Sequence, residues 1–165
     1  MKKLQFYFAA LLLLFASATI AQQHVSLDAD KHMGKHIMVN APNIVWTNGP
    51  GSLPPGSKMA ILEGDLSAPG PFTARLILPA NYKIKPHFHP AVEHVTVIEG
   101  SFFMGAGKEY NEATATEIKA GGFAVMPVGY AHFAFTKEAT TIQLHGVGPW
   151  GITYINEADD PRKKK

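Results

Sequence analysis

Turn-forming residues divide most of this chain into short segments. Glycine occurs 15 times and proline 12 times, and no long run with apolar periodicity is found after residue 21. In residues 72–78, apolar side chains alternate with Thr73 and Arg75, which is typical of a strand with one buried face. Roughly ten short strands separated by turns predict an all-β sandwich or a closed barrel. The expected strands are residues 44–46, 58–63, 72–78, 87–89, 93–98, 101–105, 123–126, 131–136, 140–147 and 151–155.

The first 21 residues have a different composition from the rest. Lys2 and Lys3 precede a nearly continuous apolar run, and small residues then lead up to Ala21. This order is typical of a secretory signal peptide, with cleavage after Ala21 or, as the weaker option, after Ala18. The apolar run is short for a membrane anchor, which needs about 20 residues. We therefore expect a periplasmic or secreted protein that has no membrane association after cleavage.

The 165 residues are enough for one domain and too few for two comfortable ones. We expect a signal peptide at residues 1–21, an N-terminal arm at 22–43, a β-barrel domain at 44–156 and a C-terminal tail at 157–165. In the arm, His32 and His36 are four residues apart and would share a helical face, where a pair can bind metal. No third ligand lies nearby, so exposed histidines are the favoured interpretation.

Charge and cysteine content exclude several classes of function. The chain has 15 Lys and Arg and 13 Asp and Glu, and removal of Lys2 and Lys3 with the signal peptide balances the two. The mature chain therefore lacks the excess of basic residues that is usual for nucleic-acid binding. The basic run at residues 162–165 is interpreted as a solvated end. There is no cysteine, so a cysteine nucleophile and thiolate ligands are excluded. Any metal must be held by nitrogen and oxygen atoms.

Two histidines and a carboxylate stand close together in the middle of the chain. His87 and His89 are two residues apart, so in a strand they project from the same face. Glu93 keeps the same parity, although Pro90 interrupts the strand between them. Gly100 then allows the chain to reverse tightly. These residues predict three ligands of a metal site on one inward face.

A second group downstream supplies a fourth candidate ligand. Pro127 and Gly129 are spaced for a tight turn, and His132 follows early on the next strand. Three imidazoles and one carboxylate suit one divalent transition metal such as Fe, Mn, Zn or Ni. An octahedral ion held in this way keeps two positions for water or substrate. A His-x-His pair alone occurs often by chance, whereas the joint spacing of both groups is far more demanding.

Together the two groups resemble the two motifs of the cupin family. The first motif is matched by His87, His89, Glu93 and Gly100, and the second by Gly121, Pro127, Gly129 and His132. The resemblance covers about residues 58–147, and Thr136 stands where the family often has asparagine. It implies a double-stranded β-helix (jelly-roll) barrel, metal ligands at His87, His89, Glu93 and His132, and a homodimer. Cupins include dioxygenases, isomerases, lyases, decarboxylases, sugar binders and sensors, so the fold does not choose the reaction.

Further candidates surround the expected pocket. Gln143 and His145 share one strand face; if that face is inward, His145 could act as a general acid or base, or it could simply be packed. Tyr130 precedes His132 near the expected mouth and could donate a hydrogen bond to a ligand, or plug the barrel end. Glu93 could release the metal and move a proton. His94 has the opposite parity to Glu93 and is expected on the exterior or at an interface.

Two functions follow from these residues and from the resemblance. The first is an exported, metal-dependent enzyme that acts on a small organic molecule. An oxygenase is the leading reaction type with Fe or Mn, and isomerase or lyase chemistry is equally expected with Zn or Ni. The second is a non-catalytic cupin that binds or senses a small ligand and uses the metal structurally.

Overall fold

The computed structural model describes residues 36–163. The expectations for the signal peptide, its cleavage at Ala21 or Ala18, and His32 lie outside these residues. The strands are β1 (Thr47–Asn48), β2 (Lys58–Glu63), β3 (Gly70–Leu78), β4 (Lys83–Phe88), β5 (Glu93–Glu99), β6 (Ser101–Ala106), β7 (Thr116–Lys119), β8 (Phe123–Met126), β9 (His132–Thr136), β10 (Thr140–Gly148) and β11 (Thr153–Tyr154). The 3₁₀ helices are η1 (Ala41–Asn43), η2 (Glu112–Thr114), η3 (Glu157–Asp159) and η4 (Pro161–Lys163). Across residues 36–163, none of the helices has the length and apolar character to span a bilayer.

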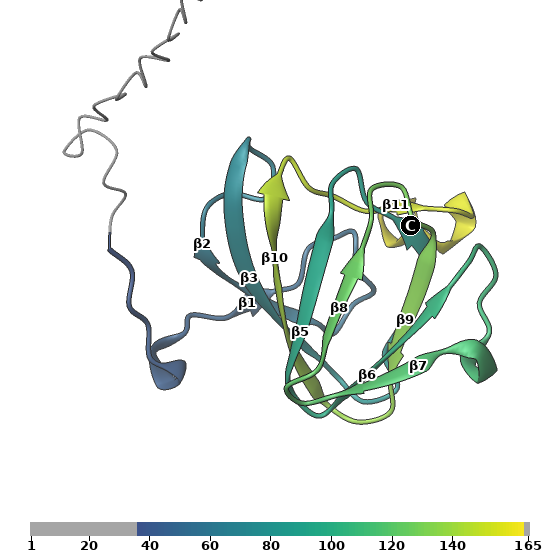
Figure 1. Ribbon diagram of the computed structural model, residues 1–165, viewed down its shortest axis with the longest axis horizontal. Helices are drawn as coiled ribbons and strands as arrows, with labels where there is room; N and C mark the ends of the chain where they lie inside the picture. Colours follow the sequence, from purple (N-terminus) through teal and green to yellow (C-terminus); the bar gives the residue numbers. More distant parts are fainter. Residues whose placement is uncertain (1–35, 164–165) are drawn as a thin grey trace, which may run out of the picture. The chain divides into compact units, whose positions relative to one another are not determined.

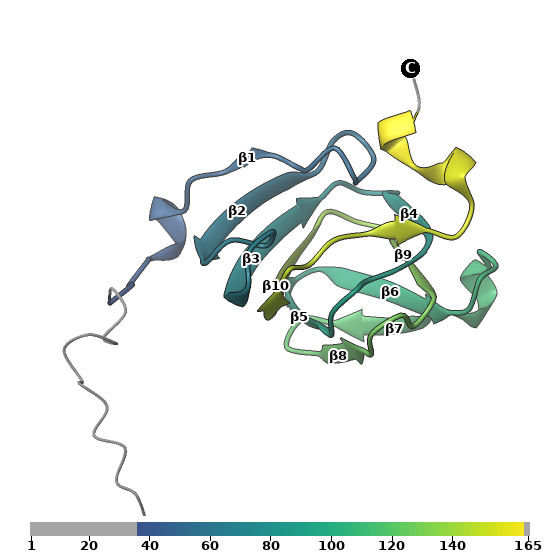
Figure 2. The ribbon, with the colours of Figure 1, turned by 90° about the horizontal axis from the view of Figure 1, so that it is seen from above.

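The described strands form two antiparallel sheets that enclose a common interior (Figure 1). One sheet has six strands in the order β1-β2-β3-β10-β5-β8, and the other has five in the order β11-β4-β9-β6-β7. Figure 2 shows β2, β3 and β10 side by side on one side of the interior, with β4, β9 and β6 on the other. The non-sequential strand order is that of a jelly roll, so the predicted all-β jelly-roll barrel is confirmed.

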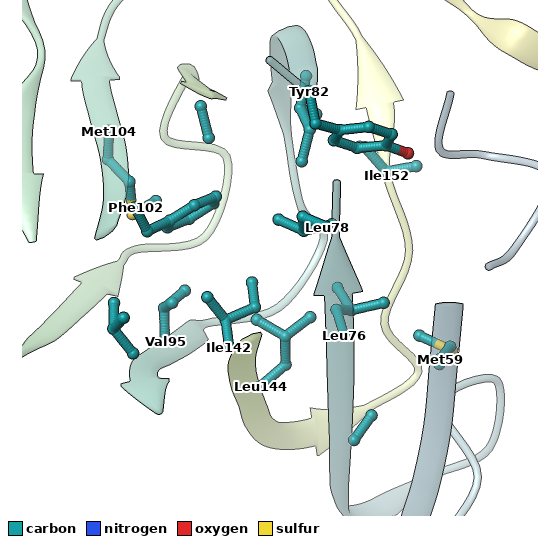
Figure 3. Packing of buried hydrophobic residues seen from close by; sticks show 14 of the residues in the cluster. Met59, Leu76, Leu78, Tyr82, Val95, Phe102, Met104, Ile142, Leu144 and Ile152 are labelled. Carbon is teal, nitrogen blue, oxygen red and sulfur yellow. The ribbon is translucent and has the colours of Figure 1, made fainter. Parts of the chain in front are cut away.

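Alternation along the strands places the core between the sheets. On β3, Phe72, Ala74, Leu76 and Leu78 are buried, as the sequence predicts, while the residues between them are partly exposed. The opposite sheet contributes apolar side chains such as Phe102, and Figure 3 shows both sets meeting in the interior. Each large apolar side chain buried in this way stabilises the fold by about 1.5–3 kcal/mol. The other members labelled in Figure 3 are Met59, Tyr82, Val95, Met104, Ile142, Leu144 and Ile152.

The segment between β6 and β8 covers a second, smaller cluster. Phe103 and Phe135 stack at 4.8 Å with an interplanar angle of 11°, and both pack with the fully buried Phe133. Tyr110, which precedes η2, packs against this cluster. Residues 107–119 therefore contain one short strand, β7, and supply an aromatic cover for this cluster.

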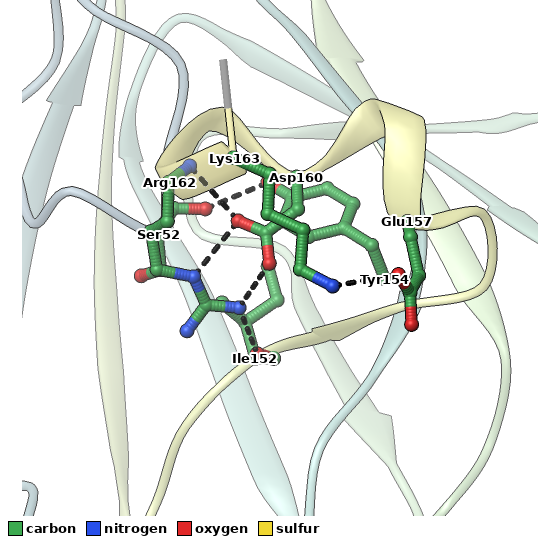
Figure 4. Close-up of polar contacts among 7 residues, drawn as sticks. All are labelled: Ser52, Ile152, Tyr154, Glu157, Asp160, Arg162 and Lys163. Carbon is green, nitrogen blue, oxygen red and sulfur yellow. Dashed lines mark hydrogen bonds and ion pairs between the residues drawn. The ribbon is translucent and has the colours of Figure 1, made fainter. Parts of the chain in front are cut away.

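The C-terminal residues pack on the barrel end (Figure 4). Arg162 donates from Nε and Nη2 to the carboxylate of Asp160 at 2.8 and 2.7 Å, and from Nη2 to the carbonyl oxygen of Ile152 at 3.1 Å. The hydroxyl of Tyr154 donates to the carbonyl oxygen of Ser52 at 2.7 Å. The Arg162 contact thus joins residues 157–163 to Ile152 just before β11, and the Tyr154 contact joins β11 to the loop between β1 and β2. The sequence did not indicate either contact.

Candidate metal centre

The four candidate ligands come from neighbouring strands and meet inside the barrel. His87 on β4 pairs in register with His132, the first residue of β9. His89 follows directly after β4, and Glu93 begins β5. All four side chains are buried, with relative exposures of 1–6%. Phe88 lies between the two histidines of the first motif, so strand alternation directs both imidazoles inward, as expected.

Backbone carbonyl groups orient the three imidazoles. Nδ1 of His87 lies 2.7 Å from the carbonyl oxygen of Lys85, and Nδ1 of His132 lies 2.9 Å from that of Tyr130. Nδ1 of His89 lies 2.6 Å from the carbonyl oxygen of Gly151. A carbonyl oxygen only accepts hydrogen bonds, so each Nδ1 carries a proton and Nε2 is the ring nitrogen left to bind a metal. Each ring is therefore held as a ligand by its own backbone partner.

The three imidazoles come together, and the Glu93 carboxylate adjoins two of them. One ring nitrogen from each of His87, His89 and His132 lies within 4.8 Å of the others. Oε2 of Glu93 lies 3.4 Å from Nε2 of His89 and 3.3 Å from Nε2 of His132. Ligand atoms around a transition metal at about 2.1 Å are themselves roughly 3.0–3.4 Å apart. The spacing of the carboxylate oxygen and two ring nitrogens therefore fits an ion between them.

Three of these atoms are buried without a hydrogen-bond partner in the described part of the chain. They are Nε2 of His89, Nε2 of His132 and Oε2 of Glu93. Buried polar atoms are almost always paired, and an unpaired one costs about 1–3 kcal/mol. A cation would satisfy all three at once, because each presents a lone pair. The residues thus fit a bound metal ion.

The electrostatics of the centre also favour a cation. Burial alone raises the pKa of Glu93, but contacts with His132 and His89 outweigh burial and hold this pKa below its usual range. Burial, together with the neighbouring His132 and His89, lowers the pKa of His87 from its ordinary 6.5 to about 3. At neutral pH the carboxylate is therefore ionised and the His87 ring is neutral, which are the forms that bind metal.

A small cavity of about 40 Å³ adjoins the four ligands. Apolar side chains from both sheets, including Leu76, Phe102 and Leu144, form most of its wall. Pro50 and Leu53 from the β1–β2 loop also line it, and the same two residues line an outer groove of about 610 Å³. This loop therefore lies between the metal centre and the outside.

Trp150 is a residue of the cavity wall that the sequence did not predict. Its indole stacks on the ring of His89, with 4.4 Å between ring centroids and an interplanar angle of 18°. Trp150 also lines the cavity. Its backbone N–H donates to the carbonyl oxygen of Leu66 at 2.6 Å. The available signal was the Gly-Pro-Trp-Gly sequence directly after the expected strand at residues 140–147, which places an aromatic ring in a turn at the barrel mouth.

Three expected pocket residues do not line the cavity. On β10, Ile142 and Leu144 face the interior, so Gln143 and His145 face outward. Arg75 Nε donates to Oε1 of Gln143 at 3.0 Å. The expectation of His145 as an acid or base at the metal is corrected for this reason.

His145 instead contributes to an aromatic group on the outer face of the sheet. It stacks on His94 at 4.8 Å with an interplanar angle of 12°. His94 thus lies on the exterior, as its parity predicts. The side chain of Tyr130 is 45% exposed and outside the cavity wall. Tyr130 therefore acts on the centre only through its carbonyl group, which holds His132.

Solved structures with this architecture are similar to the chain at low sequence identity. The polyketide cyclase RemF from Streptomyces resistomycificus has a TM-score of 0.61 at 17% identity, covering 78% of this chain and 92% of that one. A candidate acetylacetone dioxygenase from Methylibium petroleiphilum PM1 has a TM-score of 0.59 at 19% identity, covering 77% and 85%. An RmlC-like cupin from Shewanella frigidimarina has a TM-score of 0.54 at 13% identity, covering 69% and 91%. No protein-family model and no curated protein sequence matches the chain.

These likenesses and the jelly roll define the class: the chain has the cupin fold, and the recognition of a cupin from its two motifs is confirmed at that level. Within this class, the chain carries a buried histidine triad that could hold a metal ion. The reactions of the similar proteins differ from one another, so the fold leaves the activity to the site.

Proposed function

We propose that this chain is a metal-dependent enzyme that acts on a small organic molecule, with an oxygenase as the leading reaction type. The observation that carries the proposal is the set of unpaired, buried lone pairs on His89, His132 and Glu93 beside a small apolar cavity. A purely structural site would be closed by its ligands. Here the ligands border a space that a small molecule can enter.

The roles of the four residues follow from their protonation. His87, His89 and His132 would hold the ion through Nε2, and Glu93 through its carboxylate. Because the pKa of Glu93 lies below its usual range, the carboxylate serves as a ligand and is a poor proton donor. A bound Fe or Mn ion would supply redox chemistry, and Zn or Ni would supply Lewis-acid chemistry. The apolar wall excludes water from the reacting molecule.

The oxygenase proposal is supported by two dioxygenase structures of the same fold. One is the candidate acetylacetone dioxygenase described above. The other is a salicylate 1,2-dioxygenase variant from Pseudoaminobacter salicylatoxidans in complex with gentisate, with a TM-score of 0.51 at 15% identity, covering 63% of this chain and 30% of that one. The polyketide cyclase keeps isomerase or lyase chemistry open as the second reaction type.

Metal analysis followed by an oxygen-uptake screen tests the proposal. The purified protein is expected to contain about one equivalent of a divalent transition metal. The Fe and Mn forms are then offered small phenols, diketones and sugars under air. Oxygen uptake with one class, lost in the metal-free protein, supports an oxygenase. Turnover without oxygen uptake in the Zn or Ni form supports an isomerase or lyase.

A second candidate function is binding or sensing of a small ligand without chemistry. The small size of the cavity, about 40 Å³, favours it, because a substrate needs room to change shape. Tight metal binding and ligand binding without turnover of any compound in the screen would support this function over the enzyme.

Export is proposed from the N-terminal sequence alone. A periplasmic or secreted location requires removal of residues 1–21. Intact-mass measurement of the protein from the native cell is expected to give a chain that begins at Gln22. A chain that retains Met1–Ala21 would contradict export by cleavage. The expected homodimer also stays a prediction, which gel filtration of the mature chain would test.

A further inference from the structure

One hydrogen-bond donor on a residue that lines the cavity has no partner in residues 36–163. Nε1 of Trp150 is buried and unpaired, although Trp150 lines the cavity beside the metal centre. An indole N–H can only donate, and leaving a buried donor unpaired is costly. The other unpaired atoms of this cavity all present lone pairs and are explained by a cation, whereas a cation cannot satisfy an N–H. An acceptor atom beside Nε1 would pair this donor.

The indole of Trp150 is held in place from several sides. One face of the indole stacks on the His89 ring, with 4.4 Å between the ring centroids. The Phe72 ring lies beside it, with 5.8 Å between centroids and an interplanar angle of 51°. The backbone hydrogen bond to Leu66 restrains the main chain. Turning the indole to pair its N–H elsewhere would break these contacts. The donor is thus fixed beside a metal-ligand candidate.

The wall also restricts the body of the ligand. Apart from the four metal-ligand candidates and Trp150, the cavity is bordered by apolar side chains and by Ser52. The cavity volume of about 40 Å³ limits the ligand to a compact molecule. A compact molecule with an apolar body and an exposed acceptor atom fits this wall. A ligand that offers only donors leaves the indole N–H unpaired.

We propose that Trp150 binds the ligand directly, by donating a hydrogen bond from Nε1 to a carbonyl or carboxylate oxygen of a compact, mainly apolar molecule at the metal centre. This inference rests on the proposed function, because it takes the metal centre as the place where the ligand binds. It names the ligand class: small carbonyl or carboxylate compounds are bound in preference to amines and other donor-only molecules.

Acetylacetone and imidazole are suitable probes of the full-length mature protein loaded with Co²⁺. Acetylacetone offers two oxygen acceptors, whereas metal-bound imidazole has no acceptor left. Each probe is titrated while the visible absorption of Co²⁺ is followed. Trp150→Phe is expected to weaken acetylacetone binding by roughly tenfold, the effect of one lost buried hydrogen bond. Imidazole affinity and Co²⁺ content are expected to stay within about twofold of the wild type. Trp46→Phe, which changes the other tryptophan, is the matched control and is expected to alter neither probe.

Equal acetylacetone affinity in Trp150→Phe and wild type would overturn the inference, and so would an equal loss for both probes. Co²⁺ binding without acetylacetone binding in the wild type would overturn it while leaving the metal centre intact. Failure of the wild type to bind Co²⁺ would instead refute the proposed function, and this inference with it.

A second measurement needs no change at Trp150. In Trp46→Phe protein loaded with Zn²⁺, one indole N–H signal remains in the NMR spectrum. Acetylacetone is expected to shift this signal downfield and slow its hydrogen exchange. A signal that does not respond at saturating acetylacetone would overturn the inference.

Discussion

Each histidine of the candidate metal centre has its Nδ1 hydrogen-bonded to a backbone carbonyl oxygen. This occurs three times, at His87, His89 and His132. The carbonyl groups belong to chain segments that the barrel itself fixes, so the ring orientation is set by the fold. A substitution at one of these positions therefore removes a ligand without removing the frame that holds the others.

Loss of a ligand should lower metal affinity while the fold persists. His87→Ala and Glu93→Gln are each expected to weaken metal binding by more than about 100-fold, because even partners of metal ligands are worth 10–100-fold. Equilibrium dialysis with metal analysis measures this effect. His94→Ala is the matched control, since His94 lies on the outer face of the same strand as Glu93. Unchanged metal content in both ligand variants would refute the centre.

The metal-free protein should lose stability in mild acid through His87. Its pKa is about 3 when folded and 6.5 ordinarily, so below pH 6.5 the unfolded chain binds a proton that the folded chain does not. Stability therefore falls as the pH drops from about 6.5 toward 3, by roughly 2 kcal/mol at pH 5. Urea unfolding in a chelator at pH 7 and pH 5 measures the loss. His87→Gln should show a smaller loss, and an identical loss would place the acid sensitivity elsewhere.

At this scale, the spacing of residues predicted which side chains share a face, but on a strand without a motif it did not predict which face is inward. His87, His89, Glu93 and His132 were predicted as one centre because parity and turn residues constrain them, and the structure brings them together. Gln143 and His145 were placed in the pocket as an option, because which face of a strand is inward depends on its neighbours. Trp150 was missed because a single aromatic residue in a turn has no periodicity that could be recognised.

At the scale of elements, the pairing of β6 with β9 depends on Gly105, whose missing side chain leaves space for an aromatic ring. Gly105 lies opposite Phe133 in the register, and a Cβ at Gly105 would come within 2.1 Å of the ring. Phe133 is fully buried, so it has no space into which to move. The two strands can therefore pair closely only with glycine at this position.

Gly105→Ala should destabilise the protein by about 1–3 kcal/mol, the usual cost of overpacking. Gly51→Ala is the matched control, because a Cβ there meets no atom within 4 Å. It is expected to change the free energy of unfolding by less than about 0.5 kcal/mol. Chemical unfolding of both variants compares them, and equal stability would contradict the packing described for Phe133.

The strands were predicted correctly where apolar and polar residues alternate, and were missed or cut short where pairing with a strand distant in sequence forms them. Residues 58–63 match β2 in both bounds, and the expected strand at residues 72–78 lies within β3. β4 begins at Lys83, ahead of the expected residue 87, because pairing with β9 extends it. β7 was missed because its four residues carry no apolar alternation; its pairing with β6 makes it a strand.

At the scale of the whole molecule, the centre links the two motifs far apart in sequence. β4 and β9 carry three of the candidate ligands at or next to their ends, and Glu93 comes from the opposite sheet. An ion bound by all four would thus tie the two sheets together. Since the unfolded chain has no such site, binding should stabilise only the folded state.

Metal should therefore raise the thermal stability of the protein. At a metal concentration 100 times the Kd, the stabilisation is about 2.7 kcal/mol, which corresponds to a rise in Tm of roughly 10 °C for a domain of this size. Calorimetric scans with metal and with a chelator measure this shift. The Glu93→Gln variant should show less of it, and an unchanged Tm in the wild type would contradict binding across the sheets.

The protonation states of Glu93 and His87 also decide how metal binding exchanges protons with the solvent. At pH 7, Glu93 is already ionised and the ring of His87 is already neutral, so an arriving ion displaces no proton from either. The heat of metal binding should accordingly contain no ionisation heat of the buffer from these two groups. For Glu93 and His87, folding has therefore already set the protonation states that metal binding needs.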